Sequence, residues 1–170
     1  MAGSLIKITE TTLGSAASTF TMTGIDNTYN VYVVKGHNIQ GSAATTLNMR
    51  FTSSGTAVEA SNYQRNVKEL RADQNPNHYT SEDVSSLYLN DTGTTTGQIA
   101  NFTMWCFNFS NADEYSFATM EMTAMNTQGN SRGRWGNVCL EQTAAHDGIQ
   151  LFYATGDIAT ATLSLYGLKK

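Results

Sequence analysis

The residue types that most often carry chemistry are scattered along this sequence. Its three histidines are His37, His78 and His146, and no two have the spacing of metal ligands on one strand or helix. Each histidine lies at the edge of an expected strand or in a loop. We therefore expect exposed polar histidines, no metal site and no cofactor.

The 14 acidic residues are scattered, and they include two adjacent pairs, Glu82–Asp83 and Asp113–Glu114, both in expected turns. Neighbouring residues on a strand point to opposite faces, so neither pair supplies the two facing carboxyl groups that glycoside hydrolysis needs. The sequence has no Asp-x-Asp-x-Asp-Gly calcium loop. A calcium site built from distant loops stays open, because many β-sandwich lectins use one.

Nucleophile motifs are also missing from the sequence. It contains neither a Gly-x-Ser-x-Gly turn nor a glycine-rich phosphate loop. Cys139 and a distant histidine form a possible Cys/His pair. However, the segment 136–140 is typical of a strand, whereas a helix N-terminus would lower the pKa of the thiol. The sequence therefore predicts a protein without catalytic residues, not an enzyme.

One segment, 129–135, has the composition of a sugar-binding loop. Arg132, Arg134 and Trp135 lie in it, and Tyr79 is a further aromatic residue at an expected loop. Aromatic rings stack on sugars, and arginine donates hydrogen bonds to hydroxyl groups. We treat these four residues as candidate ligand or interface contacts. The alternative, which the pattern favours, is a mobile tip with Trp135 folded back into the core.

The composition favours strands and argues against nucleic acid as a partner. Charged residues make up 14% of the 170 residues, against about 25% in an average globular protein. Thr, Ser, Asn and Gly replace them, as in strands joined by polar turns. The net charge is -4, and the one positive cluster, Arg65, Lys68 and Arg71, is interpreted as a solvated loop or helical turn.

The cysteines and the N-terminal segment predict folding in a reducing cytosol. Cys106 and Cys139 lie in apolar, strand-like runs and are expected to be buried free thiols. Residues 1–7 lack the pattern of a secretory signal. No apolar run approaches the roughly 18–20 residues of a membrane helix, so we expect no contact with a membrane.

Alternating polar and apolar residues dominate the chain. About ten short segments alternate in this way, which predicts a single antiparallel β-sandwich over 1–170. The segment 56–83 is the exception. Tyr63, Val67 and Leu70 have helical spacing there, and we expect a long irregular loop with one or two helical turns.

Several apolar residues are expected on outward faces of the strands. They are Tyr32, Val34, Trp105, Phe107 and Phe109. One core does not need so many, so they indicate either a buried interface or sheets covered by loops. The alternation leaves both interpretations open.

Five segments resemble a family of tailed-bacteriophage virion structural proteins. They are 25–33, 47–51 with 61–63, 107–109 with 114–116, 133–135, and 153–168. The last segment closes on Ser164-Leu165-Tyr166-Gly167-Leu168, similar to the family's S-L-Y-G-I ending. The chain departs from the pattern in the turn 52–55 and at Ser116, where lysine is common. The resemblance implies a jelly-roll-like β-sandwich without catalytic residues.

The leading hypothesis is a non-enzymatic phage virion structural protein that acts through protein–protein contacts. It is a capsid decoration or cement protein or a tail-associated component, folded in the host cytoplasm and located in the virion. Its expected partners are other virion proteins and copies of itself, with a trimer favoured. The alternative is a carbohydrate-binding module of a tail fibre that recognises host surface glycans. A polysaccharide depolymerase is a third hypothesis, and the sequence lacks its paired carboxylates.

Overall fold

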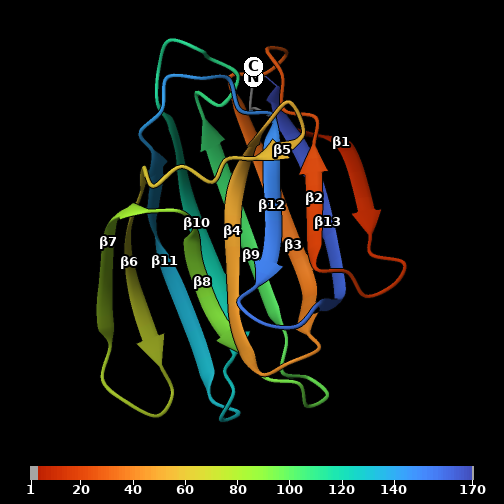
Figure 1. Ribbon diagram of the computed structural model, residues 1–170, viewed down its shortest axis with the longest axis vertical. Helices are drawn as coiled ribbons and strands as arrows, with labels where there is room; N and C mark the ends of the chain where they lie inside the picture. The colour runs from red at the N-terminus through yellow and green to blue at the C-terminus, as the bar shows by residue number, and fades with distance from the viewer. Residues whose placement is uncertain (1–3, 170) are drawn as a thin grey trace.

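The computed structural model describes residues 4–169, which form a two-layered antiparallel β-sandwich without a helix (Figure 1). The sandwich expected from the sequence is therefore confirmed. The large sheet has eight strands, in the order β1 (Ser4–Thr12), β13 (Ile158–Lys169), β3 (Val31–Gly41), β9 (Ala100–Phe107), β10 (Ser116–Met125), β11 (Ser131–Leu140), β6 (Tyr63–Arg71) and β7 (Asn77–Val84). The small sheet joins β2 (Thr19–Thr23), β12 (Gly148–Tyr153), β4 (Thr45–Ser53) and β5 (Thr56–Ala57), and β8 (Leu87–Thr92) also pairs with β4.

Strand β10 shows most simply how the sequence builds the large sheet. Its residues alternate between buried and exposed from Ser116 to Ala124, so that Met120 and Met122 face the small sheet. The exposed positions between them carry polar side chains such as Glu121 and Thr123. Burial on one face and solvent on the other is the pattern that fixes strand register.

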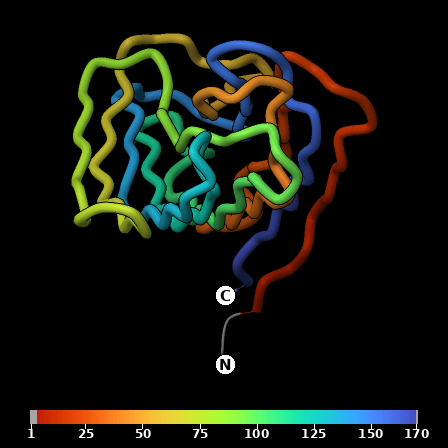
Figure 2. The backbone as a smooth tube through the Cα atoms, turned by 90° about the horizontal axis from the view of Figure 1, so that it is seen from below, coloured from red at the N-terminus to blue at the C-terminus, as the bar shows by residue number. Residues whose placement is uncertain are grey.

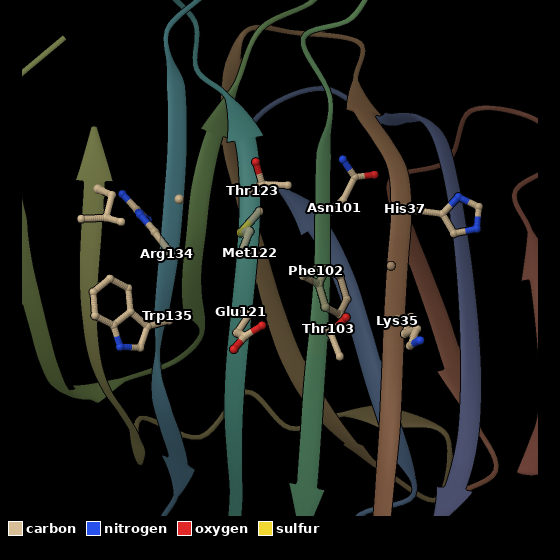
Figure 3. Close-up of a pocket in the computed structure, with 13 residues that line it drawn as sticks. Lys35, His37, Asn101, Phe102, Thr103, Glu121, Met122, Thr123, Arg134 and Trp135 are labelled. Carbon is tan, nitrogen blue, oxygen red and sulfur yellow. The ribbon is translucent and has the colours of Figure 1, made fainter. Parts of the chain in front are cut away.

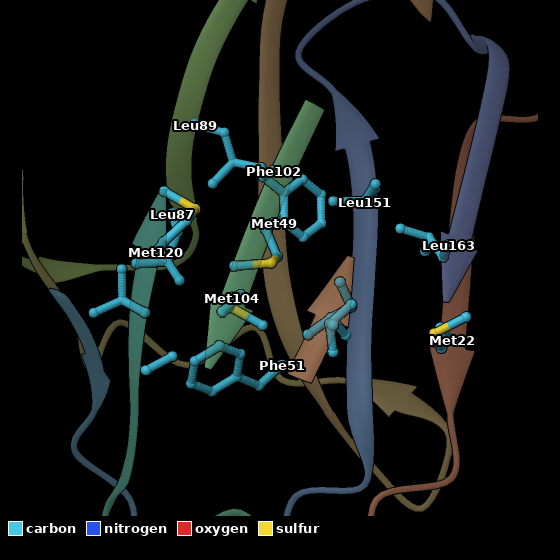
Figure 4. Close-up of a cluster of buried hydrophobic side chains, with 14 of the residues drawn as sticks. Met22, Met49, Phe51, Leu87, Leu89, Phe102, Met104, Met120, Leu151 and Leu163 are labelled. Atoms are coloured by element: carbon cyan, nitrogen blue, oxygen red, sulfur yellow. The ribbon is translucent and has the colours of Figure 1, made fainter. Parts of the chain in front are cut away.

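The core lies between the two sheets (Figure 4). Phe102, Met104 and Met120 reach it from the large sheet, and Met49 and Leu151 reach it from the small sheet. A single hydrophobic cluster unites residues of both layers. No helix long and apolar enough to cross a membrane occurs within the described range 4–169.

The prediction of a long irregular loop over 56–83 is wrong. The segment contains β5 and the long strands β6 and β7, which bring the described strands to thirteen rather than about ten. In β6 the inward positions are Tyr63, Arg65, Val67 and Glu69. Because two of these four are charged, the apolar alternation is broken and the remaining residues mimic helical spacing.

Three of the five apolar residues expected on outward faces are core residues instead. Tyr32, Val34 and Phe109 are buried in the hydrophobic cluster between the sheets. Phe109 escapes the alternation because β9 ends at Phe107 and Asn108 has a positive φ of 61°, which redirects the chain. Trp105 does face outward, at 37% exposure.

Strand β1 forms an arm at one end of the large sheet. It pairs only with β13, and Figure 2 shows it standing apart from the body of the sandwich. Leu5, Ile6 and Ile8 are all exposed on it, and only Thr9 is half-buried. The arm therefore exposes apolar side chains on both of its faces.

Candidate functional site

The large sheet turns one face away from the small sheet, and we call this side the outer face. It carries five of the eight exposed large apolar residues among residues 4–169: Leu70, Trp105, Tyr115, Phe117 and Trp135. Four of them lie on the adjacent strands β9, β10, β11 and β6, and the fifth immediately precedes β10. The other three are on the β1 arm.

The strand register sets the two tryptophans on either side of β10. Trp105 on β9 is opposite Thr119, and Trp135 on β11 is opposite Glu121. They are thus two strand spacings apart, roughly 10 Å in the plane of the sheet. Thr119 and Glu121 line a shallow depression between the two indole rings.

A larger hollow crosses the outer face from β3 to β6 and has a volume of about 750 Å³ (Figure 3). Trp135 flanks it at the β11 side, and Lys35 and His37 flank it at the β3 side. Glu121 contributes a carboxylate from β10, between them. The lining therefore offers an aromatic ring together with donors and acceptors of hydrogen bonds.

Gly133 leaves space in the lining of the hollow because it has no side chain. A Cβ at this position would find only the Cβ of Leu70, at 4.0 Å. Gly133 also has no positive φ, so its backbone accepts any residue that favours strands. A larger residue at position 133 can therefore narrow the hollow without strain.

The structure divides the four residues proposed from the sequence as ligand contacts. They do not share a loop, since Arg132, Arg134 and Trp135 all lie on β11. Alternation along the strand sends Arg132 and Arg134 into the sandwich and Trp135 to the outer face. Trp135 is 45% exposed, so the alternative of a tryptophan folded into the core is wrong. Tyr79 lies on β7 beside the two arginines.

Arg134 joins the two sheets. Its guanidinium forms an ion pair with Glu69 on β6 and donates a hydrogen bond to the carbonyl oxygen of Leu89 on β8. It also stacks on the rings of Tyr88 and Tyr79, with 4.3 Å and 5.1 Å between its Cζ and the ring centroids. Arg134 is thus buried with its charge paired, and we interpret it as a structural residue.

Glu69 is the buried carboxylate at the centre of this arginine cluster. Besides Arg134, it has the Nε atoms of Arg71 and Arg132 at 3.5 Å and 3.9 Å. Arg132 pairs more closely with Asp73, and the hydrogen bond that it donates lowers the pKa of that carboxyl group. Three arginines therefore share two acidic partners.

The prediction that the positive cluster Arg65, Lys68 and Arg71 lies in a solvated loop or helical turn is wrong, since all three residues are on β6. Arg65 is buried on β6, and burial, together with the nearby Arg134, lowers its pKa. Lys68 faces the other way, and its Nζ lies 5.7 Å from the ring centroid of Trp135. Because β6 sends these cations to opposite faces, they form no continuous basic surface.

The exposed histidine predicted at position 146 is also wrong, whereas His37 and His78 are exposed as expected. His146 is buried, and its Nδ1 lies 2.7 Å from the Oγ of buried Ser116. Phe51 and Phe109 flank its ring. Desolvation lowers the pKa of His146, which therefore favours the neutral ring. This Ser–His pair faces the core rather than a cleft, and a substrate has no path to it.

The prediction of two buried free cysteines is confirmed. Burial raises the pKa of both thiols, Cys106 and Cys139, so neither has the character of a reactive thiolate. Within residues 4–169, no group of three or more His, Cys, Asp or Glu side chains is placed to hold a metal ion.

The fold and the two apolar surfaces define a class: an antiparallel β-sandwich that presents one open sheet face and a protruding strand. No protein-family model, curated protein or solved structure matches the chain.

Proposed function

We propose that this protein is a non-enzymatic structural component of a phage particle, which contacts other virion proteins through the outer face. The observation that carries the proposal is the gathering of five exposed large apolar side chains on four adjacent strands and at the start of one of them. Four of the five are aromatic, and aromatic residues are enriched in protein interfaces.

The β1 arm supports contacts between copies of the chain. It is an edge strand, so one row of its backbone N–H and C=O groups has no ladder partner among residues 4–169. Its exposed Leu5, Ile6 and Ile8 add apolar surface next to that edge. An exposed apolar edge strand is a template for pairing with another chain, and a symmetric trimer is the assembly that we expect.

The assignment to a phage particle rests on the sequence resemblance, including the closing segment 164–168. The jelly-roll likeness and the location in the head or the tail belong to the same proposal. We propose no nucleic-acid partner, since the net charge is -4 and Arg65, Arg132 and Arg134 are buried. We propose no membrane partner either, since neither surface combines a basic patch with its apolar residues.

Light scattering on the purified protein tests the proposal. We expect an oligomer, and we expect Phe117→Lys to weaken the binding of the protein to phage particles, because a charge then replaces an aromatic ring on the outer face. Thr19→Lys is the matched control, since Thr19 is exposed on β2 of the small sheet. A wild-type monomer that also fails to bind phage particles refutes the proposal. The proposal is also refuted if Phe117→Lys changes neither the oligomeric state nor the binding to phage particles.

Carbohydrate binding is a second candidate function, favoured by the hollow beside Trp135. The hollow has an exposed indole ring with Glu121 beside it at the β11 side, and Lys35 and His37 at the β3 side. This lining suits a sugar, which offers an apolar ring face and several hydroxyl groups. A glycan array with and without calcium tests it. Gly133→Val narrows the hollow and should weaken glycan binding, whereas Ser131→Val on the same strand should not. If no glycan binds the wild-type protein, this candidate is excluded.

A further inference from the structure

A row of residues crosses the outer face at right angles to its strands, and we call it the charge row. Register pairs connect its members one strand at a time from β6 to β1. Every second strand contributes a charged residue: Lys68 on β6, Glu121 on β10, Lys35 on β3 and Glu10 on β1. Since neighbouring strands are about 4.8 Å apart, the charges follow one another at intervals of roughly 10 Å, and their sign alternates.

The two central charges of the row, Lys35 and Glu121, form no ion pair with any of residues 4–169. Thr103 on β9 is the register partner of both and lies midway between them (Figure 3). Glu121 is exposed and Lys35 is half-buried, so both charges are open to a partner. At the end of the row Glu10 is less free, since it pairs with Lys7 at 3.0 Å.

The alternation of sign makes the charge row complementary to itself. A two-fold axis that runs along β9 through Thr103 sets the outer face of a second copy against the first and exchanges the two sides of the row. Strand β3 of each copy then faces β10 of the other, because both strands pair with β9. Lys35 meets Glu121 of the second copy once on each side of the axis. A two-fold axis along the row itself would instead set each charge against an identical one.

The central pair carries more of this complementarity than the ends of the row. Packed sheets are inclined by about 30°, so positions near the axis stay opposite each other and those farther out are displaced. Lys35 and Glu121 are each one strand away from β9, whereas Glu10 and Lys68 are three strands away.

The apolar residues of the outer face match under the same axis. Trp105 lies on β9 two residues from Thr103 and is exposed, so its indole ring meets the indole ring of the second copy. Phe117 on β10 and Val31 on β3 are both register partners of Phe107 on β9. The axis therefore sets the exposed ring of Phe117 against Val31 of the second copy, and aromatic rings are enriched in interfaces.

We infer that the outer face binds a second copy of this chain, face to face, about a two-fold axis along β9. The inference rests on the proposed function, which takes the outer face as a contact surface, and it names the partner. Seven strands from β1 to β6 and the eight residues of β9 give this face a flat area of roughly 800 Å², about what each partner buries in a stable interface. The two-fold contact is separate from the threefold contact expected at the β1 arm, and the two together would give six copies.

Charge reversal at the two central positions tests the inference. Lys35→Glu sets like charges against each other twice in the dimer, and Glu121→Lys does the same with the opposite sign. Each single variant should raise the dissociation constant of the two-fold contact at least tenfold, measured by light scattering over a dilution series. The double variant exchanges the two charges and should associate as the wild-type protein does.

An equimolar mixture of the two single variants is the sharper experiment. In a mixed dimer, both central contacts again join a cation to a carboxylate, so the mixture should associate although each variant alone does not. This rescue also shows that both variants are folded, and an ion pair within one chain would not produce it. Asp157→Lys is the control, because it makes the same change of charge as Glu121→Lys at an exposed position in the turn between β12 and β13.

The inference is overturned if the single variants associate as tightly as the wild-type protein, or if neither the double variant nor the mixture restores association. A wild-type monomer, or a trimer that neither reversal changes, overturns it as well. If Phe117→Lys still weakens binding to phage particles in that case, the outer face binds a different virion protein and the proposed function stands. A dimer that behaves as expected, from a chain that is absent from particles, would reject the proposed function and leave the two-fold contact intact.

Discussion

Glu69→Gln is the substitution that most sharply tests how the two sheets are held together. It keeps the shape of the side chain but removes the negative charge that Arg71, Arg132 and Arg134 share. Asp73 then remains as the only acidic partner among their ion pairs. Removing one partner of a buried ion pair typically costs about 3–5 kcal/mol, because the other charge stays buried without compensation.

The expected loss follows from that range. For a domain of this size, 1 kcal/mol corresponds to a shift of about 2–4 °C in the unfolding temperature, so Glu69→Gln should lower it by about 6–20 °C. Urea unfolding followed by tryptophan fluorescence measures the free energy directly. Trp135 is a suitable reporter, since it neighbours Arg134 on β11.

A double-mutant cycle shows whether the ion pair itself is responsible. Glu69→Met combined with Arg134→Met removes both charges, and we expect it to cost much less than the sum of the single substitutions. If Glu69→Gln stays within about 0.5 kcal/mol of wild type, as surface substitutions do, the buried cluster does not stabilise the sandwich. Strictly additive costs in the cycle would refute the coupling between Glu69 and Arg134.

Three further predictions concern single residues. The pKa of His146 is lowered in the folded state, so the unfolded state binds more protons below the ordinary histidine pKa of about 6.5, and stability should fall as the pH drops below that value. His146→Gln should flatten this dependence in urea midpoints at pH 7.5 and 5.5; an equal slope in both proteins would reject the role. Gly136→Ala should lower the unfolding temperature, because its Cβ would lie 2.1 Å from the carbonyl oxygen of Asn66, whereas Gly133→Ala on the same strand should be neutral. Cys106 should react with a thiol reagent only on unfolding, since burial raises its pKa; a fast reaction of the native protein would show that β9 opens locally.

The sequence predicts the strands in which the inward positions are consistently apolar and the outward positions polar. In β10 every inward position except Ser116 is apolar, so the pattern alone identifies the buried face. In β6 the same geometry is hidden, since Arg65 and Glu69 occupy inward positions. Arg65 and Glu69 find their partners on β8 and β11, and a local sequence pattern does not predict such long-range hydrogen bonds and ion pairs.

The candidate site shows the same division between local and long-range information. The outward direction of Trp105 follows from alternation in the segment 99–109, and the sequence predicts it. The hollow does not follow, because it depends on the register that sets Gly133 opposite Leu70. The sequence does not identify Glu121 as a site residue for a related reason. A single carboxylate is a candidate only once the strand register places it opposite Trp135. Alternation between Arg134 and Trp135 was the available signal that they face opposite ways.

The position of His146 also needed the tertiary structure. Its neighbours in sequence, Ala145 and Asp147, are those of a polar loop, and they favour an exposed ring. The backbone N–H of His146 instead donates to the carbonyl oxygen of Phe109, and Asp147 holds the loop against Thr52 of β4. These contacts bridge distant segments and carry the ring into the core.

Quantifying the chain in purified particles tests our proposal that this sandwich is a structural part of a phage particle. Particles of the phage that encodes it are separated from free protein, and its peptides are counted against those of the other virion proteins. We expect a fixed stoichiometry that survives purification, with a copy number in multiples of three if the expected trimer forms. Absence of the chain from intact, infectious particles would contradict it.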